Sequence, residues 1–580
     1  MLKQLAGCVR EYKRPTILTL IFIVGEAVIE TIIPFITANL VNRIKAGASI
    51  ESVMEVGLLL IIMAAISLVC GGLAGFTCAK ASTGFAKNLR SDLFHRIQTY
   101  SFENIDKFSS SSLVTRMTTD VTNVQMAFMM LIRIAIRSPL LLIFSTVMAF
   151  VMGGKLAFVF VVVIPILAFG LLAIGKKAMP AFRSVFKKYD RLNESIEENV
   201  RGMRVVKGFS REEYEKQKFN TAADNIRKDF TKAECIVALN TPLMNLCMYI
   251  NMVVVLLVGS KLAITSGGSA LDVGQISGML TYGMQILMSV MMISMIYVMV
   301  TMSAESAKRI CEVLEEEPSL KEPENPVMEV KDGSIEFKNV NFKYSAKAKK
   351  YALSDIDLSI RSGMTVGIIG GTGSSKSSLV QLIPRLYDVT EGAVLVGGVD
   401  VRSYDIPALR SAVAMVLQKN VLFSGTIKDN LRWGNETATD EEIREACRLS
   451  QADEFIQTFP DKYDTYIEQG GSNVSGGQKQ RLCIARALLK KPKILILDDS
   501  TSAVDTKTDA LIRAGFKNYI PDTTKIIIAQ RIVSVEDADL IIVMDNGSIS
   551  AAGTHEDLLQ SSDIYREVYE QQTKGGNENE

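Results

Sequence analysis

Histidine is scarce in this chain of 580 residues, which has only His95 and His555. This scarcity leaves little room for catalysis or metal binding by imidazole groups. The eight cysteines are scattered, with no CxxC pair and no histidine at zinc-ligand spacing, so we interpret them as small buried apolar residues. The chain also has almost no excess of charge of either sign, because 64 Lys and Arg residues balance 63 Asp and Glu residues. A formal net charge of +1 offers no global attraction to nucleic acid, and we expect no nucleic-acid partner.

Apolar residues, in contrast, are abundant: 48% of the chain is hydrophobic, and the mean hydropathy of +0.21 is high for a soluble domain. Six apolar runs each come close to the roughly 20 residues that a helix needs to cross a bilayer. They cover residues 16–41, 53–79, 127–152, 156–177, 237–263 and 275–301. The long polar segments after the second and fourth runs are rich in Lys and Arg, so we expect these segments to face the cytosol. The sequence therefore predicts a membrane domain of six helices over residues 1–303, with long cytosolic extensions and both termini in the cytoplasm.

The pattern changes after residue 303. Residues 304–327 are charged and contain Pro318, Pro323 and Pro326, as expected of a linker. Over residues 328–580, short β-rich runs alternate with helical stretches, which is typical of an α/β domain. The predicted fold is thus a polytopic α-helical membrane domain fused to a soluble α/β domain. The N-terminus has neither the apolar core of a secretory signal nor a transit-peptide composition, which favours a prokaryotic plasma membrane.

A glycine- and serine-rich segment lies between a predicted strand and a predicted helix, the setting that a phosphate-binding loop requires. Backbone N–H groups of such a loop, with the helix N-terminus, bind phosphate; the alternative is a turn without a ligand. We expect Lys376 to reach the β- and γ-phosphates and Ser377 to bind Mg²⁺. The loop pattern G-x-x-x-x-G-K-[ST] has glycine where this chain has Ser375, which keeps the N–H but restricts the backbone. The residues expected at the nucleotide are Gly370, Thr372, Gly373, Ser374, Ser375, Lys376, Ser377 and Ser378.

Further segments resemble motifs of the ATP-binding cassette (ABC) family. Asp498 ends the apolar run ILILDD and resembles the Walker B acid, which holds Mg²⁺ through water, and residues 474–478 (VSGGQ) resemble the signature LSGGQ. By the same resemblance Tyr344 stacks on adenine, Gln418 is the Q-loop glutamine at Mg²⁺, and residues 502–505 form the D-loop. The resemblance covers essentially the whole chain.

Six apolar runs ahead of one cassette are similar to a half-transporter of the ABC exporter superfamily. The resemblance implies a dimer in which each ATP lies between the phosphate-binding loop of one chain and the signature of the other. The signature residues assigned in this way to the partner's ATP are Ser475, Gly476, Gly477 and Gln478. By position, Ser109–Val121 and Gly208–Phe219 match the family's coupling helices; otherwise they are solvated helices.

Two positions depart from the family pattern. Asp499 stands where the family has the glutamate that orients the attacking water, and Gln530 stands where it has the switch histidine. The shorter carboxylate and the uncharged amide predict a degenerate site that hydrolyses ATP slowly. We therefore expect a heterodimer whose second half-transporter carries the catalytic Glu and the switch His. The alternative is a homodimer in which Asp499 works.

Glu26 and Glu30 lie at i and i+4 in the first apolar run, and so on one helix face. Ionisable groups at membrane depth are costly, so we hypothesise that they contact a cationic or polar part of the cargo. The alternative is that they hydrogen-bond to neighbouring helices or lie near the interface. The last two runs are rich in methionine, which suits either a polyspecific cavity or ordinary helix packing.

Taken together, these patterns predict a subunit of an ATP-driven exporter in a bacterial plasma membrane, with ATP and Mg²⁺ as cofactors and membrane lipids around it. The expected cargo is a lipophilic or amphipathic compound, such as a drug, a lipid or a peptide. An importer on the same fold and an ATP-gated channel or sensor remain as alternatives.

Overall fold

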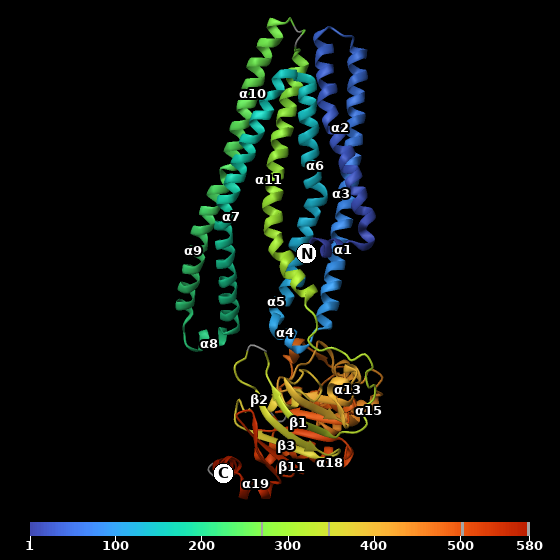
Figure 1. Cartoon of the computed structure of the whole chain (residues 1–580), viewed down its shortest axis with the longest axis vertical. Coiled ribbons are helices and arrows are strands. Elements are labelled where there is room, and N and C mark those ends of the chain that lie inside the picture. Colours follow the sequence, from blue (N-terminus) through green and yellow to red (C-terminus); the bar gives the residue numbers. More distant parts are fainter. Residues whose placement is uncertain (268, 270, 346–347, 500–503, 577–580) are drawn as a thin grey trace. The chain divides into compact units, whose positions relative to one another are not determined.

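The computed structural model describes residues 1–267, 269, 271–345, 348–499 and 504–576 (Figure 1). It divides into two compact units. The membrane unit comprises Met1–Gln98 and Ser109–Glu316, and the nucleotide unit comprises Thr99–Phe108 and Glu317–Glu580.

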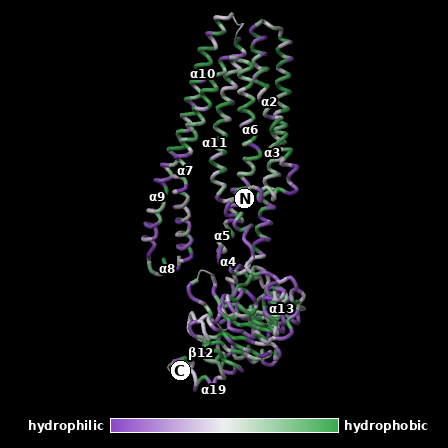
Figure 2. Tube along the Cα trace, viewed as in Figure 1, coloured by the Kyte–Doolittle hydropathy of each residue, from purple (hydrophilic) through white to green (hydrophobic). Residues whose placement is uncertain are grey.

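The membrane unit is built from long helices. Its helices are α1 (Leu2–Gly7), α2 (Lys13–Lys45), α3 (Ile50–Gln98), α5 (Ser110–Thr115), α6 (Val121–Gly153), α7 (Phe158–Arg201), α8 (Met203–Gly208), α9 (Glu212–Ala238), α10 (Asn240–Thr265) and α11 (Val273–Glu315), with 3₁₀ turns η1 (Arg10–Tyr12) and η3 (Gly154–Ala157) and a π-helical turn η2 (Arg116–Asp120). Hydrophobic residues follow one another along α2, α3, α6 and α10, whereas α9 is largely hydrophilic (Figure 2). Such continuous apolar surface is the property of helices in contact with lipid.

Five helical segments are long and apolar enough to cross a membrane, where the sequence predicted six. The predicted third and fourth runs fall in a single segment, Ser110–Val185, because only η3 separates α6 from α7. A straight helix of 76 residues would measure about 114 Å, far more than a bilayer of about 30 Å. The helix is interrupted at Gly154, whose φ of +50° lies outside the helical range, and the chain reverses there, so that α5 and α8 lie near the same end of the unit (Figure 1).

Helix α11 continues through the first half of the segment predicted as a linker, 304–327. It begins with a capping box between Asp272 and Gln275, and its last turns bury Ile310 and Val313. These buried side chains hold the helix together as far as Glu315, before the first of the three prolines, Pro318. The exact bounds of the two domains stay a prediction.

The nucleotide unit contains a sheet of six strands in the order β12-β11-β3-β10-β9-β6. The strands β3 (Thr365–Gly370), β6 (Val413–Val416), β9 (Ile494–Asp498), β10 (Thr524–Ile528) and β11 (Leu540–Asp545) are parallel, and β12 (Ser548–Gly553) is an antiparallel edge. A second, antiparallel sheet has the order β2-β1-β4-β5, formed by β1 (Ile335–Phe342), β2 (Leu353–Ile360), β4 (Glu391–Val396) and β5 (Val399–Asp400). A short ribbon pairs β7 (Gly425–Thr426) with β8 (Tyr466–Ile467). Strands β9 and β10 are buried on both faces, which explains the apolar runs 494–497 and 526–528 within them.

Helices cover both faces of the parallel sheet. They are α12 (Lys376–Gln381), α13 (Ile406–Ala412), α14 (Ile427–Arg432), α15 (Asp440–Leu449), α16 (Asp453–Thr458), α17 (Gly476–Leu489), α18 (Thr506–Tyr519), α19 (His555–Ser561) and α20 (Asp563–Gly576), with 3₁₀ turns η4 (Val401–Ser403), η5 (Lys462–Asp464), η6 (Gln469–Gly471) and η7 (Ile532–Ser534). Side chains of β9 alternate between two cores: Leu495 and Leu497 pack with α17, whereas Ile494 and Ile496 pack with α12. This layered arrangement leaves the carboxyl ends of the parallel strands as one edge on which loops converge.

One short segment from the N-terminal half of the chain belongs to the nucleotide unit. Helix α4 (Phe102–Phe108) is held there by Asn104, which is 3% exposed and donates from Nδ2 to the carbonyl of Glu317 at 3.0 Å. The hydroxyls of Ser101 and Ser319 are 2.5 Å apart. Thr99–Phe108 is thus the part that packs on this unit, whereas the predicted coupling segment Ser109–Val121 belongs to the membrane unit, and its coupling role stays a prediction. Isolated polar contacts of this kind cannot be predicted from the spacing of hydrophobic residues.

Candidate functional site

A pocket of about 530 Å³ lies where the carboxyl ends of neighbouring parallel strands meet. Gly370–Gly373 and Ser375–Ser378 follow β3, Asp498 and Asp499 end β9, Gln530 follows β10, and Gln418 follows β6. Because these four strands are adjacent, segments that lie up to 160 residues apart in the sequence share one pocket. The structure therefore brings together most of the side chains that the sequence assigned to phosphate and Mg²⁺.

The loop after β3 wraps around the side chain of Lys376. Its Nζ donates to the carbonyls of Gly370 at 2.7 Å and Gly371 at 2.8 Å, and to Oγ of Ser374 at 3.2 Å. Burial lowers the pKa of Lys376, while Asp499 and Asp498 act in the opposite direction. A partly buried ammonium with nearby backbone N–H groups is suited to binding the phosphates of a nucleotide.

The backbone of this loop is strained at one residue. Ser375 has a φ of +67°, in the left-handed region that glycine adopts without cost. Serine therefore replaces the glycine of the loop pattern at a position where the backbone conformation favours glycine. At Gly370, any side chain would collide with the carbonyl of Met544 on the adjacent strand β11.

Asp498 and Ser377 form the part of the pocket that fits a hard cation. The hydroxyl of Ser377 donates to Oδ1 of Asp498 at 2.9 Å, and Asp498 is 4% exposed. Burial is the largest effect on the pKa of Asp498 and raises it, and the neighbouring Asp499 adds to this, whereas Ser377 and Lys376 lower it. Within the described residues no group of three or more His, Cys, Asp or Glu side chains could hold a metal ion. One carboxylate and one hydroxyl suit Mg²⁺ that arrives with phosphate ligands of its own.

Asp499, at the position of the family's glutamate, accepts two hydrogen bonds from amides. Its Oδ2 accepts from Nε2 of Gln530 at 2.7 Å and from Nε2 of Gln418 at 3.3 Å. The carboxylate is 8% exposed, and its backbone φ of +49° turns the chain sharply after β9. Neither amide can take up or release a proton, so this cluster contains no second acid–base group.

Helix α20 supports the segment that carries Gln530, a contribution that the sequence analysis missed. Nε2 of Gln572 donates to the carbonyl of Gln530 at 2.8 Å, and Oε1 of Gln572 accepts from the backbone N–H of Ile532 at 2.9 Å. Val568 of the same helix lines the pocket. No local pattern in α20 signals this role, because the contacts depend on how the helix returns to the sheet.

Tyr344 lies beside the phosphate-binding loop and not inside the pocket. Its hydroxyl is 2.7 Å from Oγ of Ser378, and the residue is 42% exposed. Its ring contacts those of Phe342 and Tyr387, with centroids 4.8 Å and 5.1 Å away. A ring anchored at one end and exposed over part of its surface can stack on a base. The sequence analysis did not identify Tyr387.

The signature segment is exposed and lies outside the pocket of its own chain. Ser475 caps α17, with its Oγ accepting from the N–H of Gln478 at 3.3 Å and its N–H donating to Oε1 of Gln478 at 2.9 Å. Gly476 and Gly477 form the first turn of this 14-residue helix. Of the predicted D-loop, residues 502 and 503 lie outside the described residues, and Asp505 caps α18 by accepting from the N–H of Thr508.

Glu26 and Glu30 lie together on α2, as their spacing predicted, and contact Arg137 of α6. Nη2 of Arg137 donates to both carboxylate oxygens of Glu30 at 2.7 Å and lies 3.5 Å from Oε1 of Glu26. The alternative that these acids bind a neighbouring helix thus describes the structure. Arg137 stands in the third apolar run, and a basic residue within a span was the signal that the sequence analysis did not use.

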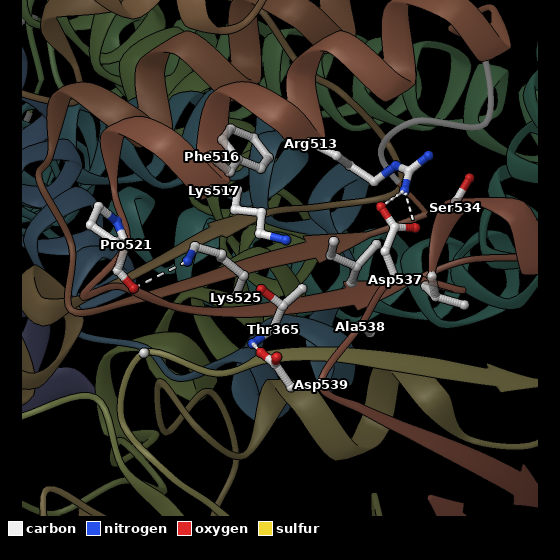
Figure 3. A pocket seen from close by; sticks show the side chains of 13 residues that line it. Thr365, Arg513, Phe516, Lys517, Pro521, Lys525, Ser534, Asp537, Ala538 and Asp539 are labelled. Carbon is white, nitrogen blue, oxygen red and sulfur yellow. Dashed lines mark hydrogen bonds and ion pairs between the residues drawn. The ribbon is translucent and has the colours of Figure 1, made fainter. Parts of the chain in front are cut away.

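A second pocket of the nucleotide unit, of about 350 Å³, lies at the amino ends of β3 and β10 (Figure 3). Nη1 of Arg513 donates to both carboxylate oxygens of Asp537 at 2.8 Å, and Oδ2 of Asp539 accepts from the N–H of Thr365 at 2.7 Å. This pocket lies at the edge of the sheet opposite the phosphate-binding loop, and its charged groups largely satisfy one another. It is not part of the nucleotide site.

Comparisons with known proteins agree with this geometry. A family model described as "ABC transporter transmembrane region" matches residues 16–290, and one described as "ABC transporter" matches residues 353–502. The chain is 36% identical over 555 residues to "Uncharacterized ABC transporter ATP-binding protein YfiB" of Bacillus subtilis (strain 168), with 96% of each chain covered. It is 35% identical over 564 residues to "Uncharacterized ABC transporter ATP-binding protein Rv1273c" of Mycobacterium tuberculosis (strain ATCC 25618 / H37Rv), again with 96% of each covered.

The fold matches a solved structure described as "Structure of a bacterial Atm1-family ABC exporter with ATP bound". The TM-score is 0.85 at 23% identity, over 97% of this chain and 99% of that chain. A transmembrane region followed by one nucleotide-binding domain, in a chain that is similar to its relatives over nearly their full length, confirms the family that the motifs predicted. The chain belongs to the ABC transporter family, as an exporter-type half-transporter with one membrane-spanning domain and one ATP-binding cassette.

Proposed function

We propose that this chain is one half of a heterodimeric exporter, and that its own nucleotide site binds ATP but hydrolyses it slowly. The observation that carries the proposal is the 2.7 Å hydrogen bond from Gln530 to Asp499, at the two positions where the family has the catalytic carboxylate and the switch histidine. The second amide, from Gln418, approaches the same carboxylate oxygen. An oxygen that already accepts from two amides is poorly placed to orient an attacking water.

The same geometry supports the binding of ATP and Mg²⁺ by this chain. Lys376 and the loop amides would hold the β- and γ-phosphates, and Tyr344 would stack on adenine. Ser377, Gln418 and Asp498 would hold Mg²⁺ beside the phosphates. When bound, Mg²⁺ neutralises phosphate charge and orients the terminal phosphate.

The signature of this chain would complete the ATP site of a second half-transporter. Ser475, Gly476 and Gly477 form a helix N-terminus, which attracts phosphate and does not line the phosphate-binding pocket of its own chain. The partner, with the catalytic Glu and the switch His, would carry out most of the ATP hydrolysis, while ATP in this chain's site holds the dimer together.

In the membrane unit, α6 and α7 would cross the bilayer separately and give six crossings, with both termini in the cytoplasm of a bacterium and the chain in its plasma membrane. The cargo would be a lipophilic or amphipathic compound, such as a drug, a lipid or a peptide. Glu26 lies 3.5 Å from Arg137, whereas Glu30 lies 2.7 Å from it, so Glu26 is bound less closely and is the acid that we expect to exchange this contact for a polar group of the cargo. ATP-driven closure would alternate access between the two sides of the membrane.

The test is the ATPase activity of this chain purified alone and purified with the half-transporter that co-purifies with it. The partner is used in its natural form and with its catalytic Glu replaced by Gln. We expect activity only in the pair, and its loss on the partner's Glu→Gln change. Strong activity of this chain alone, abolished by Asp499→Asn, would overturn the proposal in favour of a homodimer with a working Asp499.

The direction and mode of transport need a separate assay. Cargo accumulation in inverted membrane vesicles supports export, and depletion supports an importer on the same fold. Ion currents without concentrative transport would instead indicate an ATP-gated channel.

A further inference from the structure

Helix α20 meets the nucleotide site along a single face. Tyr565, Val568 and Gln572 are spaced at i, i+3 and i+7, so their side chains lie on one side of the helix. Tyr565 is fully buried, and Val568 packs against the same core and lines the phosphate-binding pocket. This face therefore carries its apolar residues into the nucleotide unit and brings Gln572 to the segment that follows β10.

The start of α20 is anchored to α19 and to its own cap. The Tyr565 hydroxyl lies 2.7 Å from Nδ1 of His555 in α19, and the backbone N–H of Tyr565 donates to Oγ of Ser562 at 3.3 Å. The rings of His555 and Tyr569 pack edge-on, with centroids 5.3 Å apart. A helix that is held at its first two turns presents its next turn, which carries Gln572, in a defined place.

Gln572 binds the two successive peptide groups that flank Arg531. Its Nε2 donates to the carbonyl of Gln530 at 2.8 Å, and its Oε1 accepts from the N–H of Ile532 at 2.9 Å. One amide, which has both donors and an acceptor, thus fixes the backbone from which the Gln530 side chain extends. The far end of that side chain donates to Oδ2 of Asp499 at 2.7 Å.

Asp499, which accepts this hydrogen bond, is fixed by its own backbone. Its N–H donates to the carbonyl of Ile528 at 3.1 Å, and Ile528 lies opposite Asp498 where β10 pairs with β9. Both partners of the bond between Gln530 and Asp499 are therefore attached to neighbouring strands. Loss of the Gln572 amide would free the backbone at Gln530 while leaving the Asp499 backbone in place.

We propose that Gln572 is a positioning residue of the nucleotide site: it holds the backbone of residues 530–532, so that the Gln530 amide stays on Asp499 and restrains this carboxylate. The proposal rests on the function proposed above, in which that hydrogen bond keeps hydrolysis slow. It goes further by assigning part of the restraint to α20, since Gln572 is 42 residues beyond Gln530 in the chain. Gln572 thus acts on the rate from outside the pocket.

The experiment measures phosphate release by the purified pair of half-transporters, with the partner's catalytic Glu replaced by Gln so that only this chain's site turns over. Gln572→Met removes both hydrogen bonds and keeps an unbranched side chain of similar length. We expect it to raise kcat by roughly fivefold, the size of one lost hydrogen bond, because Asp499 loses its restraint. KM for ATP should stay unchanged, since Lys376 keeps its contacts in the phosphate-binding loop.

Gln571→Met is the matched control. Gln571 precedes Gln572 in the same helix, and its amide donates within α20, to Oε1 of Glu567 at 3.2 Å. Both glutamines are exposed, so neither change removes a side chain from the core, and the control should keep the natural kcat.

Gln530→Met supplies the second background. Without an amide at residue 530 there is no donor for Gln572 to position, so the further change Gln572→Met should leave kcat where Gln530→Met alone puts it. A role of α20 in stability alone would not produce this dependence on residue 530.

The outcomes separate this inference from the function on which it depends. If the natural site already turns over as fast as the partner's natural site, the slow site proposed above is wrong, whatever Gln572 does. If the natural site is slow and Gln572→Met leaves kcat unchanged or lowers it, the slow site stands and the role of Gln572 falls. If Gln572→Met changes kcat by the same factor with and without the Gln530 amide, its effect does not pass through Gln530, and the inference is again overturned.

Discussion

If the nucleotide site of this chain is slow, as proposed, restoring the two family residues should convert it into an active one, and the two changes should reinforce each other. The changes are Asp499→Glu and Gln530→His, singly and together. In Asp499→Glu alone, the longer carboxylate stays within reach of the Gln530 amide, which lies 2.7 Å from the present one. In Gln530→His alone, the Asp499 carboxylate loses the amide donor, but its side chain is still one methylene shorter than the glutamate of the family.

The size of the reinforcement follows from the hydrogen bond that links the two positions. A hydrogen bond to a charged group contributes about 1.5–3 kcal/mol, and we take the lower end because Gln530 is exposed. The double variant should therefore exceed the product of the two single effects by roughly tenfold. Restoring one electrostatic group in a catalytic site typically changes the rate by about 10²-fold, so the double variant should gain at least that much over the natural chain.

The assay is phosphate release by the purified pair, with the partner's catalytic Glu replaced by Gln so that only this chain's site can turn over. Lys376→Ala in the double variant is the control, because it removes the ammonium at the phosphate-binding loop and should return the rate to background. Strictly multiplicative single effects would refute the idea that Gln530 restrains Asp499. A natural chain already as fast as the double variant would refute the degenerate site itself.

Three further predictions concern stability. Arg137→Met should lower the free energy of unfolding of the detergent-purified chain by about 3 kcal/mol, seen as a lower melting temperature, because it leaves the Glu30 and Glu26 carboxylates without their cation. Adding Glu30→Gln to this variant should recover part of the loss. No recovery would contradict the ion pair. Ser375→Gly should stabilise the nucleotide unit by about 0.5–1 kcal/mol, since glycine adopts a φ of +67° without strain, whereas Ser375→Ala should not; equal effects of the two changes would exclude strain as the cause. In the native state the pKa of Asp498 is raised above 3.8, so in EDTA the free energy of unfolding should fall as the pH rises from about 3.8 through the native pKa. Thermal unfolding at several pH values measures this fall, and Asp498→Asn should abolish the part that Asp498 contributes. An identical pH profile in the variant would contradict the raised pKa.

The parts of the site that the sequence predicted are those built from local segments at strand ends. The phosphate-binding loop, Asp498 and Gln530 each follow a recognisable apolar strand, and parallel strands bring their carboxyl ends to one edge. The strand–loop–helix setting predicted the phosphate-binding loop, and the resemblance to the ABC family assigned Asp498 and Gln530 to the same site. The membrane spans were predictable for a similar reason, because length and hydropathy are local properties, although the turn at Gly154 is too short to separate two segments.

The features that the sequence did not predict depend on contacts between side chains that lie far apart in the sequence. Arg137 binds Glu30 from another helix, Gln572 of α20 holds the segment of Gln530, and Tyr387 links Tyr344 to α4. Each contact involves one residue from each element, so neither element shows a pattern that reveals its partner. The packing of Thr99–Phe108 on the nucleotide unit was not predicted for the same reason: the residues that attach this segment are a serine and an asparagine with no periodicity.

The inclusion of Thr99–Phe108 in the nucleotide unit makes this unit discontinuous along the chain. The side-chain hydrogen bonds that attach the segment join residues 213 to 281 positions apart, and the larger part of the membrane unit, Ser109–Glu316, is synthesised between them. Non-local contacts of this kind form late, because the intervening loop must close first. A cassette excised at residue 317 would lack a piece of its own surface and would expose Tyr387 and the backbone around Ser319. Completion of the cassette therefore waits until residues 317–319 have been synthesised, after the whole membrane unit, and a synthetic peptide of residues 99–108 should bind to the excised domain.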